Sequence, residues 1–517
     1  MEESKLSILS QLNAALTVSS ILWLVAAWFA YRVAVAIYNI SPLHPLSRFP
    51  GPKIAAVSYL YEAYYDWWRV GRYGRVIKEM HERYGPIVRI NPDELHCSDP
   101  LFTDEIYTSS PHRIRDKWQH QLNTGGAGPV SVTGFSTVSH EQHRAKRAPL
   151  SRFFSRAQML KLEGEVHDFA NLTVSKMLST AGRGEVFDVK EAFNCFTADV
   201  ISQYCFGEPM GFVAQEGWEP NFATWVKSFF KSAYMMRHNV VARTMAQALP
   251  FMADYLGDDV RSVMKVMNVT IPEYIRAALE DRGEGNGRVF AEVMGDRKDM
   301  SEEEKYRYNG EGFNFLLAGT ETTAAILTVL TYYLLSSPHH LPHLLQSLPD
   351  SHDWRSLEKN TYLTALLLEC LRLMPGVSHR SARIARLEDL SYTSSDGKFS
   401  YLIPRGTPIG MTSMINHWDE SLFPSPDDFI PERWIKEDGS VDQALKNRLI
   451  AFGKGSRSCV GENLAYCELY IMAALMATKV LPRAKLIDTT VEDISYDHDL
   501  IVLQTKKGSI SVKIEIE

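Results

Sequence analysis

The chain has 517 residues, 45% of them hydrophobic, and a formal net charge of −7 at pH 7. This length permits a large core in two to four domains, and the absence of a basic excess argues against a nucleic-acid partner. The six cysteines are far apart and form no C-x-x-C pair. We therefore expect neither a disulfide framework nor a zinc site, and this cysteine usage is typical of a reducing compartment.

An apolar run without any charged residue extends from Leu6 to Tyr31. A membrane-spanning helix needs about 20 mainly apolar residues, so residues 1–40 are predicted to be an N-terminal transmembrane anchor. The alternative is a cleaved secretory signal, which has a positive leading end and a shorter apolar stretch. This chain instead begins with Glu2 and Glu3, which favours the anchor.

Positive charge follows the apolar run at Arg32, Arg48 and Lys53. Because positive flanks stay on the cytosolic side of a membrane, we expect a single-pass protein with its main domain in the cytosol. Residues 41–52, between the anchor and this domain, contain four prolines. Proline cannot continue a helix, so this segment is predicted to be a semi-rigid hinge.

Residues 53–517 are expected to form one mainly helical domain, because helical periodicity dominates residues 155–375. Small peripheral sheets are predicted from β-prone segments at 87–90, 399–403 and 510–516.

Two glycine-rich stretches, at 124–129 and 283–287, interrupt this domain. The second lacks a preceding strand and has Arg288 where a dinucleotide motif needs its last glycine. Both are interpreted as loops.

A long helix is predicted from about residue 302 to the stop at Pro338. Ser301 and Glu304 have the spacing of a capping box, and about 35 residues at 1.5 Å rise span about 50 Å. The middle of this helix is apolar except for Thr320–Thr323.

These polar groups need partners if they are buried. One interpretation is that the Thr322 hydroxyl bonds back to the carbonyl of Ala318 and bends the helix slightly, but this leaves the carboxylate of Glu321 unexplained. The other interpretation is that Thr322 and Glu321 carry out chemistry.

Glu369 and Arg372 stand at i and i+3 in a helix that is apolar nearly all round. Such pairs usually decorate solvated helices. The apolar surroundings instead indicate a buried pair, which needs a third partner.

The segment from Phe452 to Gly461 presents one cysteine, Cys459, in the pattern F-x-x-G-x-R-x-C-x-G. Its glycines leave backbone N–H groups free to approach the sulfur, Arg457 is placed to meet an anionic cofactor, and Phe452 shields the loop from solvent. A lone cysteine is more often a small buried hydrophobe. A thiolate ligand is the other interpretation.

Together these motifs resemble the cytochrome P-450 superfamily, in its membrane-anchored microsomal class. The similarity covers nearly the whole chain: apolar anchor, proline hinge, A-G-x-E-T-T helix, E-x-x-R helix, P-E-R-W and cysteine loop occur in the expected order. It implies a mainly α fold with small β-sheets, bound haem b and Cys459 as the axial ligand of the haem iron.

The resemblance implies a role for each matching residue. Thr322 would donate a hydrogen bond on the oxygen side of the haem, Glu321 would relay protons, and Arg433 would complete the buried pair of Glu369 and Arg372. A histidine stands where the family commonly has the tryptophan of W-x-x-x-R, and a solvated basic face is the alternative for that stretch. The implied cofactor-binding residues are Cys459, Arg457, Phe452, Arg383, His143 and Arg147.

The expected activity is that of a monooxygenase that uses O2 and receives electrons from NADPH through a reductase in the endoplasmic reticulum membrane. Exposed cations near residues 144–152 and Lys454 are predicted to form a positive patch for this donor. Relatives that rearrange or dehydrate substrates without a redox partner tend to lose the acid–alcohol pair, and a non-enzymatic haem-binding protein would have no use for it.

The substrate is expected to be a lipophilic small molecule. Residues 140–155 and 362–380 look like fungal secondary-metabolism members that oxidise trichodiene-type sesquiterpenes, which favours a terpenoid intermediate. A polyketide or another natural-product scaffold is the alternative.

Overall fold

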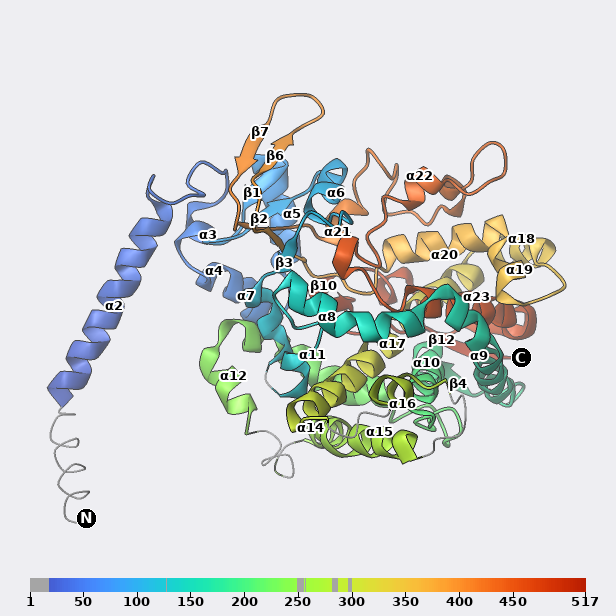
Figure 1. Cartoon of the computed structure of the whole chain (residues 1–517). Helices are drawn as coiled ribbons and strands as arrows, with labels where there is room; N and C mark the ends of the chain where they lie inside the picture. The colour runs from blue at the N-terminus through green and yellow to red at the C-terminus, as the bar shows by residue number, and fades with distance from the viewer. Residues whose placement is uncertain (1–17, 127, 249–254, 256, 281–286, 296–299) are drawn as a thin grey trace, which may run out of the picture.

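The computed structural model describes residues 18–126, 128–248, 255, 257–280, 287–295 and 300–517. The protein is mainly helical with small sheets (Figure 1), as predicted. The longer helices are α2 (Val18–Ile40), α5 (Tyr73–Tyr84), α8 (His140–Ser151), α9 (Arg156–Leu178), α10 (Val189–Phe206), α11 (Phe222–His238), α12 (Val240–Ala246), α14 (Asp258–Lys265), α15 (Ile271–Glu280), α17 (Glu302–Ser336), α18 (His340–Ser347), α20 (Thr361–Leu373) and α23 (Glu462–Leu475).

Shorter helical segments connect these helices. They are α3 (Lys53–Val57), α4 (Leu60–Ala63), η1 (Tyr64–Trp68), η2 (Pro100–Phe102), α6 (Thr103–Ile106), α7 (Gln119–Leu122), η3 (Asn123–Gly125), η4 (Pro129–Val132), η5 (Arg152–Phe154), η7 (Val266–Thr270), α16 (Val289–Met294), α19 (Trp354–Glu358), α21 (Ser413–Asn416), η8 (Pro431–Trp434), α22 (Gln443–Lys446), η9 (Gly455–Arg457), η10 (Met476–Val480), η11 (Leu481–Arg483) and η12 (Val491–Asp493).

The largest sheet has five short strands in the order β1 (Ile87–Arg89), β2 (Leu95–Cys97), β8 (Pro408–Gly410), β5 (Arg383–Ala385) and β3 (Arg115–Lys117). Only its β2–β8 pair is parallel. The smaller sheets are the hairpin β6 (Leu390–Thr393) and β7 (Ser400–Ile403), the hairpin β10 (His498–Leu500) and β11 (Val502–Gln504), and the three-stranded set β4 (Val186–Asp188), β12 (Lys513–Ile516) and β9 (Ala484–Leu486). Strands β1, β7 and β12 confirm the three predicted β-prone segments.

Helix α17 crosses the middle of the domain (Figure 1). The Ser301 hydroxyl accepts a hydrogen bond from the Glu304 N–H at 3.2 Å, and the Glu304 carboxylate accepts one from the Ser301 N–H at 3.4 Å. This confirms the predicted capping box, and the helix ends at Ser336 as expected from Pro338.

Two glycines allow other elements to pack directly on the α17 backbone. A Cβ atom at Gly310 would stand 2.2 Å from the carbonyl oxygen of Pro129, and one at Gly319 would stand 3.0 Å from Cγ1 of Ile201. Segment η4 and helix α10 therefore lie closer to α17 than larger residues would permit.

Helix α2 stands apart from the body of the protein (Figure 1). Residues Ser20–Ile40 are long and apolar enough to cross a membrane, and none of this window is buried. Two other helical stretches, Glu302–Ser336 and Glu462–Arg483, also pass by length and composition, but 61% and 83% of their windows lie buried inside the protein. The predicted anchor thus coincides with the exposed apolar helix, except for residues 1–17, which lie outside the described residues.

The proline-rich segment that follows α2 packs on the domain. Leu46 and Phe49 are buried in a cluster with strands of the large sheet. Nη2 of Arg48 donates to the carbonyl of Leu402 at 2.6 Å, and Nη1 of Arg89 donates to the carbonyl of Asn39 at 2.9 Å. These contacts fix the direction in which α2 leaves the domain.

Candidate active site

Glycines let the loop around Cys459 pack closely on its neighbours. Gly455 has φ of +70°, and a Cβ there would stand 2.4 Å from the carbonyl oxygen of Tyr107, so no side chain fits. The Cys459 N–H donates to the carbonyl of Phe452 at 2.8 Å. The centroid of the half-buried Phe452 ring lies 5.2 Å from that of Tyr466.

Cys459 is solvent-accessible, whereas the other five cysteines are buried. Protein around the thiol still desolvates it and raises its pKa, against the Gly461 N–H and Arg147, which lower it. The raised pKa keeps this thiol protonated. Binding to a metal ion would remove the proton, since only the thiolate is a metal ligand. The exposure of Cys459 differs from that expected of a small buried hydrophobe, the sequence-based alternative.

Four cations gather near this thiol without a carboxylate partner. Among the residues that the structure describes, Lys117, Arg147, Arg383 and Arg457 form no ion pair. Burial, then Arg383, Arg457 and Arg147, lower the pKa of Lys117 well below its ordinary value. Burial, then Arg383, lowers the pKa of Arg457 to about 9. The cluster is therefore a set of mutually repelling charges in a desolvated place.

The sheet itself places two of these cations opposite each other. Lys117, the last residue of β3, is the cross-strand partner of Arg383, the first residue of β5. Like charges directly opposite in a sheet are destabilising. This register is explained if an anion lies between the two side chains.

Backbone carbonyls orient all four cations. Nζ of Lys117 donates to the carbonyl of Phe135 at 2.8 Å, and Nη1 of Arg383 donates to that of Ala382 at 3.0 Å. The guanidinium of Arg457 donates to the carbonyls of Thr137 and Val138, each at 2.8 Å, and its buried Nε has no hydrogen-bond partner among the described residues. Nη1 of Arg147 donates to the carbonyl of Ser458 at 2.6 Å. His143 is buried beside them, and burial, then Arg457, lowers its pKa to about 2. The predicted residues Arg457, Arg383, Arg147 and His143 thus meet in one place.

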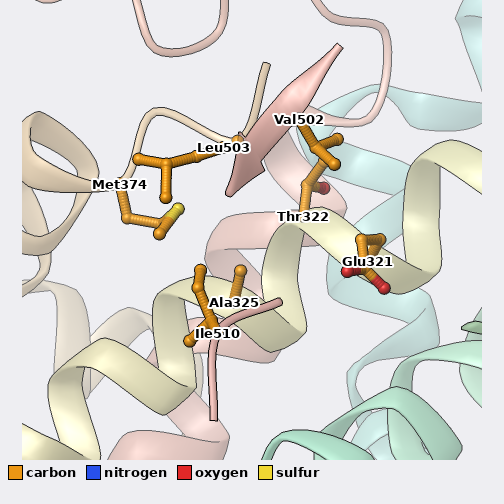
Figure 2. A pocket seen from close by; sticks show the side chains of 8 residues that line it. Glu321, Thr322, Ala325, Met374, Val502, Leu503 and Ile510 are labelled. Atoms are coloured by element: carbon orange, nitrogen blue, oxygen red, sulfur yellow. The ribbon is translucent and has the colours of Figure 1, made fainter. Parts of the chain in front are cut away.

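Helix α17 presents Thr322 and Glu321 beside a second set of side chains (Figure 2). The Thr322 hydroxyl donates to the carbonyl of Ala318 at 2.9 Å, so the back-bond considered from the sequence is present. Oε1 of Glu321 lies 2.6 Å from Nζ of Lys190 on α10, and Figure 2 shows its carboxylate directed away from the other labelled side chains. The two neighbours therefore have different partners in this state.

A small cavity adjoins both residues. It has a volume of about 10 Å³ and is lined by Glu321, Thr322, Ala325, Met374, Gly376, Val502, Leu503 and Ile510. This is room for about one water molecule, provided that it finds polar partners. The polar side chains of this lining are those of Thr322 and Glu321.

The predicted buried ion pair is present and has more partners than expected. Nη2 of Arg372 donates to Oε1 of Glu369 at 2.8 Å, and Nε of Arg433 donates to the same oxygen at 3.2 Å. Nε1 of Trp434 donates to Oε2 of Glu369 at 2.9 Å. The carboxylate is therefore fully satisfied within the protein interior.

His417 connects this network to the cysteine loop. Its Nδ1 lies 3.0 Å from the carbonyl oxygen of Arg372, and its Nε2 accepts the backbone N–H of Ile450 at 3.0 Å. Burial lowers the pKa of His417 to about 3, so the neutral ring bridges α20 and the segment that leads to Cys459.

Comparison with known proteins decides the family. The cytochrome P450 family model matches residues 66–512. The chain belongs to the cytochrome P450 family. It is 37% identical to cytochrome P450 monooxygenase ppzE of Metarhizium majus, over 84% of this chain and 95% of that protein. It is 33% identical to tryptophan 6-hydroxylase fscE of Fusarium equiseti over 99% of both chains, and 32% identical to N-acetyltryptophan 6-hydroxylase ivoC of Emericella nidulans over 95% and 97%.

As a P450, this protein is a monooxygenase that uses haem b and O2, takes electrons from a reductase and acts on a small molecule. The residues of the site fit haem. An accessible thiol can bind the iron, and the unpaired cations Lys117 and Arg383 on neighbouring strands match the two propionates of the cofactor.

Sequence reasoning missed Lys117, His417 and Lys190. None belongs to a motif, and each reaches the site only through non-local packing: β3 pairs with β5, His417 bonds to residues 372 and 450, and Lys190 meets Glu321 across 131 residues.

Not all the cations predicted to form the patch for the electron donor are free at the surface. Nζ of Lys146 donates inward to the carbonyl of Val132 at 2.8 Å and to Oγ1 of Thr137 at 3.0 Å. Lys454 lies 3.3 Å from Asp104, which offsets its charge. Arg144 and Arg152 remain exposed on this side.

A second group of potential ligands is part of a buried ionic cluster. Ligand atoms of Glu62, His120 and His238 lie within 4.8 Å of one another. Two arginines already contact Glu62 and its neighbour Asp66. Arg380 donates to Glu62, and Nη1 of Arg237 donates to Asp66 at 3.0 Å. The guanidinium groups supply the positive charge that a metal ion would bring, so we assign no metal here.

Proposed function

We propose that this P450 oxidises a lipophilic small molecule of a fungal secondary-metabolite pathway, with Cys459 as the axial ligand of the haem iron. The observation that carries this proposal is the accessible Cys459 thiol facing cations that have no carboxylate partner. The thiolate-bound haem, when present, supplies the oxygen-activating chemistry. Electrons would come from NADPH through a membrane-bound P450 reductase.

The chain's own residues would divide the remaining tasks. Arg147, Arg383 and Arg457, joined by Lys117, would hold the haem propionates, and His143 would donate a ring N–H beside them. Phe452 would exclude water from the sulfur side, where it packs on Tyr466. Each of these contacts is charge-assisted or desolvated, so each strengthens cofactor retention.

Thr322 and Glu321 would deliver protons on the other side. Glu321, whose Oε1 lies 2.6 Å from Nζ of Lys190, would first leave this ion pair and take up a proton from solvent. A water in the adjacent cavity of about 10 Å³ would accept that proton and pass one of its own to the Thr322 hydroxyl. The ion pair is therefore the resting position of the ionised carboxylate.

Two substrate classes have separate support. The similarity of residues 140–155 and 362–380 to trichodiene-type enzymes favours a terpenoid, with a polyketide as a further candidate. The names of two relatives, a tryptophan 6-hydroxylase and an N-acetyltryptophan 6-hydroxylase, favour an aromatic amino-acid derivative. Either class contains an apolar body that suits the mainly apolar lining near Thr322.

We further propose that residues 1–40 anchor the protein in the endoplasmic reticulum membrane, that 41–52 form the hinge and that 53–517 form the cytosolic haem domain. The exposed apolar helix α2 supports the first assignment, because about 20 apolar residues suffice to span a bilayer. The buried Leu46 and Phe49 support a hinge that fixes the pose of the domain.

The decisive experiment compares wild type with Cys459→Ser. We expect reduced wild-type protein with carbon monoxide to give the difference spectrum typical of thiolate ligation, and the variant to lose it. An unchanged Soret spectrum in the variant would overturn the proposal. Microsomes supplied with reductase and NADPH, incubated separately with farnesol, trichodiene and N-acetyltryptophan, then show by mass spectrometry which compound gains one oxygen.

A further inference from the structure

Glu191 on α10 is a buried carboxylate that no step of the proposed chemistry uses. It is 8% exposed, and it forms no ion pair within the described part of the chain. Its Oε2 accepts hydrogen bonds from Nδ2 of Asn221 at 2.7 Å and from Nδ2 of Asn194 at 3.3 Å. Because a buried charge is costly unless an opposite charge lies near it, this carboxylate needs an explanation.

A role in capping α11 does not account for the charge of Glu191. The Asn221 side chain caps α11 through its Oδ1, which accepts the N–H of Thr224 at 3.2 Å. Its Nδ2 also donates to the carbonyl of Trp218 at 2.9 Å. A neutral glutamine would offer Asn221 the same acceptor oxygen as Glu191 does. The negative charge therefore points to a cation nearby.

The cation beside Glu191 is Lys190, which already pairs with Glu321 of α17. Nζ of Lys190 lies 2.6 Å from Oε1 of Glu321, and the lysine side chain is 3% exposed. Burial would lower the pKa of this ammonium group, but Glu321, then Glu191 and Asp188, hold the pKa above its ordinary value. One buried ammonium group therefore lies among three carboxylates.

Lys190 belongs to a face of α10 that lies along α17. Residues spaced by three or four share one side of a helix, and those of this face are Lys190, Asn194, Thr197 and Ile201. Oγ1 of Thr197 donates to the carbonyl of Thr320 at 3.0 Å, and Ile201 packs on Gly319. Asn194 is therefore one turn from Lys190 on the side that faces α17.

The Asn194 side chain carries an acceptor that is not in use. Asn194 is fully buried, and its Oδ1 has no hydrogen-bond partner among the described residues. Unsatisfied buried acceptors of this kind are uncommon and need an explanation. An ammonium group has three N–H donors, and side chains one helical turn apart are neighbours. The Lys190 ammonium group can therefore bond to this oxygen, beside Glu191, once it is released from Glu321.

We propose that Glu191 and Asn194 form a second position for the Lys190 ammonium group, which it occupies while Glu321 is turned toward the cavity beside Thr322. The inference rests on the proposed function, in which Glu321 leaves the ion pair and takes up a proton from solvent. Lys190 keeps its three protons and has a carboxylate beside it in both positions. Glu191 is thus a positioning residue: it removes the penalty that an uncompensated buried ammonium group would place on the release of Glu321.

The test measures the protonation of Glu321 in the ferric holoenzyme as a function of pH. The infrared absorption of its carboxylic acid C=O group, identified by its loss in Glu321→Gln, gives the midpoint. If the second position lacks its charge or its acceptor, Lys190 stays at Glu321 and keeps it ionised to lower pH. We expect the midpoint to fall by about one pH unit, a tenfold change in proton affinity, in both Glu191→Gln and Asn194→Leu.

The other variants separate a second position from a general change of charge. Asn194→Leu changes no charge, so its shift reports the position itself. Glu185→Gln removes a carboxylate with 55% exposure and should keep the wild-type midpoint, whereas Glu191→Asp should titrate close to wild type. The remaining titratable groups near Glu191 are Asp188 and Cys195, and they are the same in every variant.

The inference is wrong if folded Asn194→Leu titrates like wild type, or if Glu185→Gln shifts the midpoint as far as Glu191→Gln does. Asn194→Ala, which also lacks the acceptor, repeats the test if Asn194→Leu does not fold. The carbon monoxide difference spectrum establishes that each variant holds haem through a thiolate. With a substrate identified by turnover, an unchanged yield of product per NADPH in Glu321→Gln would show that the proposed proton route itself fails, which is a separate result.

Discussion

Lys117 and Arg383 face each other across two strands, close to Arg457 and Arg147, with no ion-pair partner in the described part of the chain. Like charges opposite each other in a sheet are destabilising, and an anion bound between the half-buried Lys117 and the buried Arg383 would offset this repulsion. At the scale of single residues, this repulsion indicates an anionic cofactor more strongly than any one motif residue does. It also identifies Lys117 as part of the site.

We expect Lys117→Met to lose haem faster than wild type. A charge-assisted hydrogen bond contributes roughly 1.5–3 kcal/mol, so dissociation should accelerate about tenfold or more. The haem-free variant should not be less stable than haem-free wild type, because Lys117 is repelled there. Haem transfer to excess apomyoglobin measures the rate. Lys398→Met, whose side chain is 77% exposed, is the control, and equal rates in the two variants would contradict the assignment.

Lys190 should control how efficiently electrons are used. Its Nζ holds Glu321 at 2.6 Å, and the two side chains are 3% and 14% exposed. Lys190→Met leaves Glu321 as an uncompensated, largely buried carboxylate, whereas Lys190→Arg keeps the charge. We expect the methionine variant to form several-fold less product per NADPH consumed and the arginine variant to recover much of it. Product, peroxide and NADPH measured together give this ratio. A ratio in Lys190→Met equal to that of wild type would remove Lys190 from the proton path.

Helix α20, segment η8 and the stretch that leads to the cysteine loop are joined around Glu369. Its carboxylate accepts from Arg372, Arg433 and Trp434, and His417 extends the network to Ile450. The cysteine loop therefore takes its position from a buried network about 90 residues upstream in sequence rather than from its own glycines alone.

Glu369→Ala should abolish stable haem binding. Removal of this carboxylate leaves two buried arginines unpaired, which costs about 3–5 kcal/mol. Haem content per chain and thermal unfolding of the purified protein measure the effect. Glu358→Ala, which removes a carboxylate with 39% exposure from its pair with Arg156, is the matched control and should keep full haem content. A Glu369→Ala protein with normal haem content would show that the network does not position Cys459.

Local sequence patterns predicted the helices well. They did not predict which distant strands pair with each other or in which register. The capping box at Ser301, the stop at Pro338 and the cysteine loop depend on neighbours within ten residues, and the structure confirms the helix bounds. The pairing of β3 with β5, which brings Lys117 to Arg383, depends on segments more than 260 residues apart. No periodicity in either strand contains that information, because each has only three residues.

At the scale of the molecule, a buried ionic cluster joins the N-terminal elements to the walls of the active site. Arg380, in the segment after α20, contacts Glu62 of α4, Asp66 of η1 and Glu94 before β2. Arg237 of α11 reaches Asp66, and His120 of α7 lies 3.0 Å from Glu62. The relative placement of these elements therefore depends on the charge state of the cluster.

Glu94 is the member whose titration falls near neutral pH. Burial raises the pKa of Glu94 to about 7, against the lowering effect of Arg380, while its unfolded value is 4.5. Between these values the folded protein keeps a proton that the unfolded chain has lost. The contribution of Glu94 to the free energy of unfolding is thus fully present below about pH 4.5. It is lost as pH rises to about 7, which lowers the free energy of unfolding by up to about 3 kcal/mol.

Glu94→Gln should remove this slope, because the amide does not titrate. The other groups that face Glu94 do not produce the same pH dependence of stability. Arg380 and Arg237 stay charged, and the pKa values of Glu62 and Asp66 are lowered. Burial lowers the pKa of His120, so its contribution to stability has the opposite sign. We therefore expect the stability of wild type relative to Glu94→Gln to fall between pH 5 and pH 7.5. Urea unfolding across this range measures it, with exposed Glu82→Gln as the control. Parallel curves for wild type and Glu94→Gln would mean that Glu94 is ionised throughout, held so by Asn91, Gln121 and Arg380.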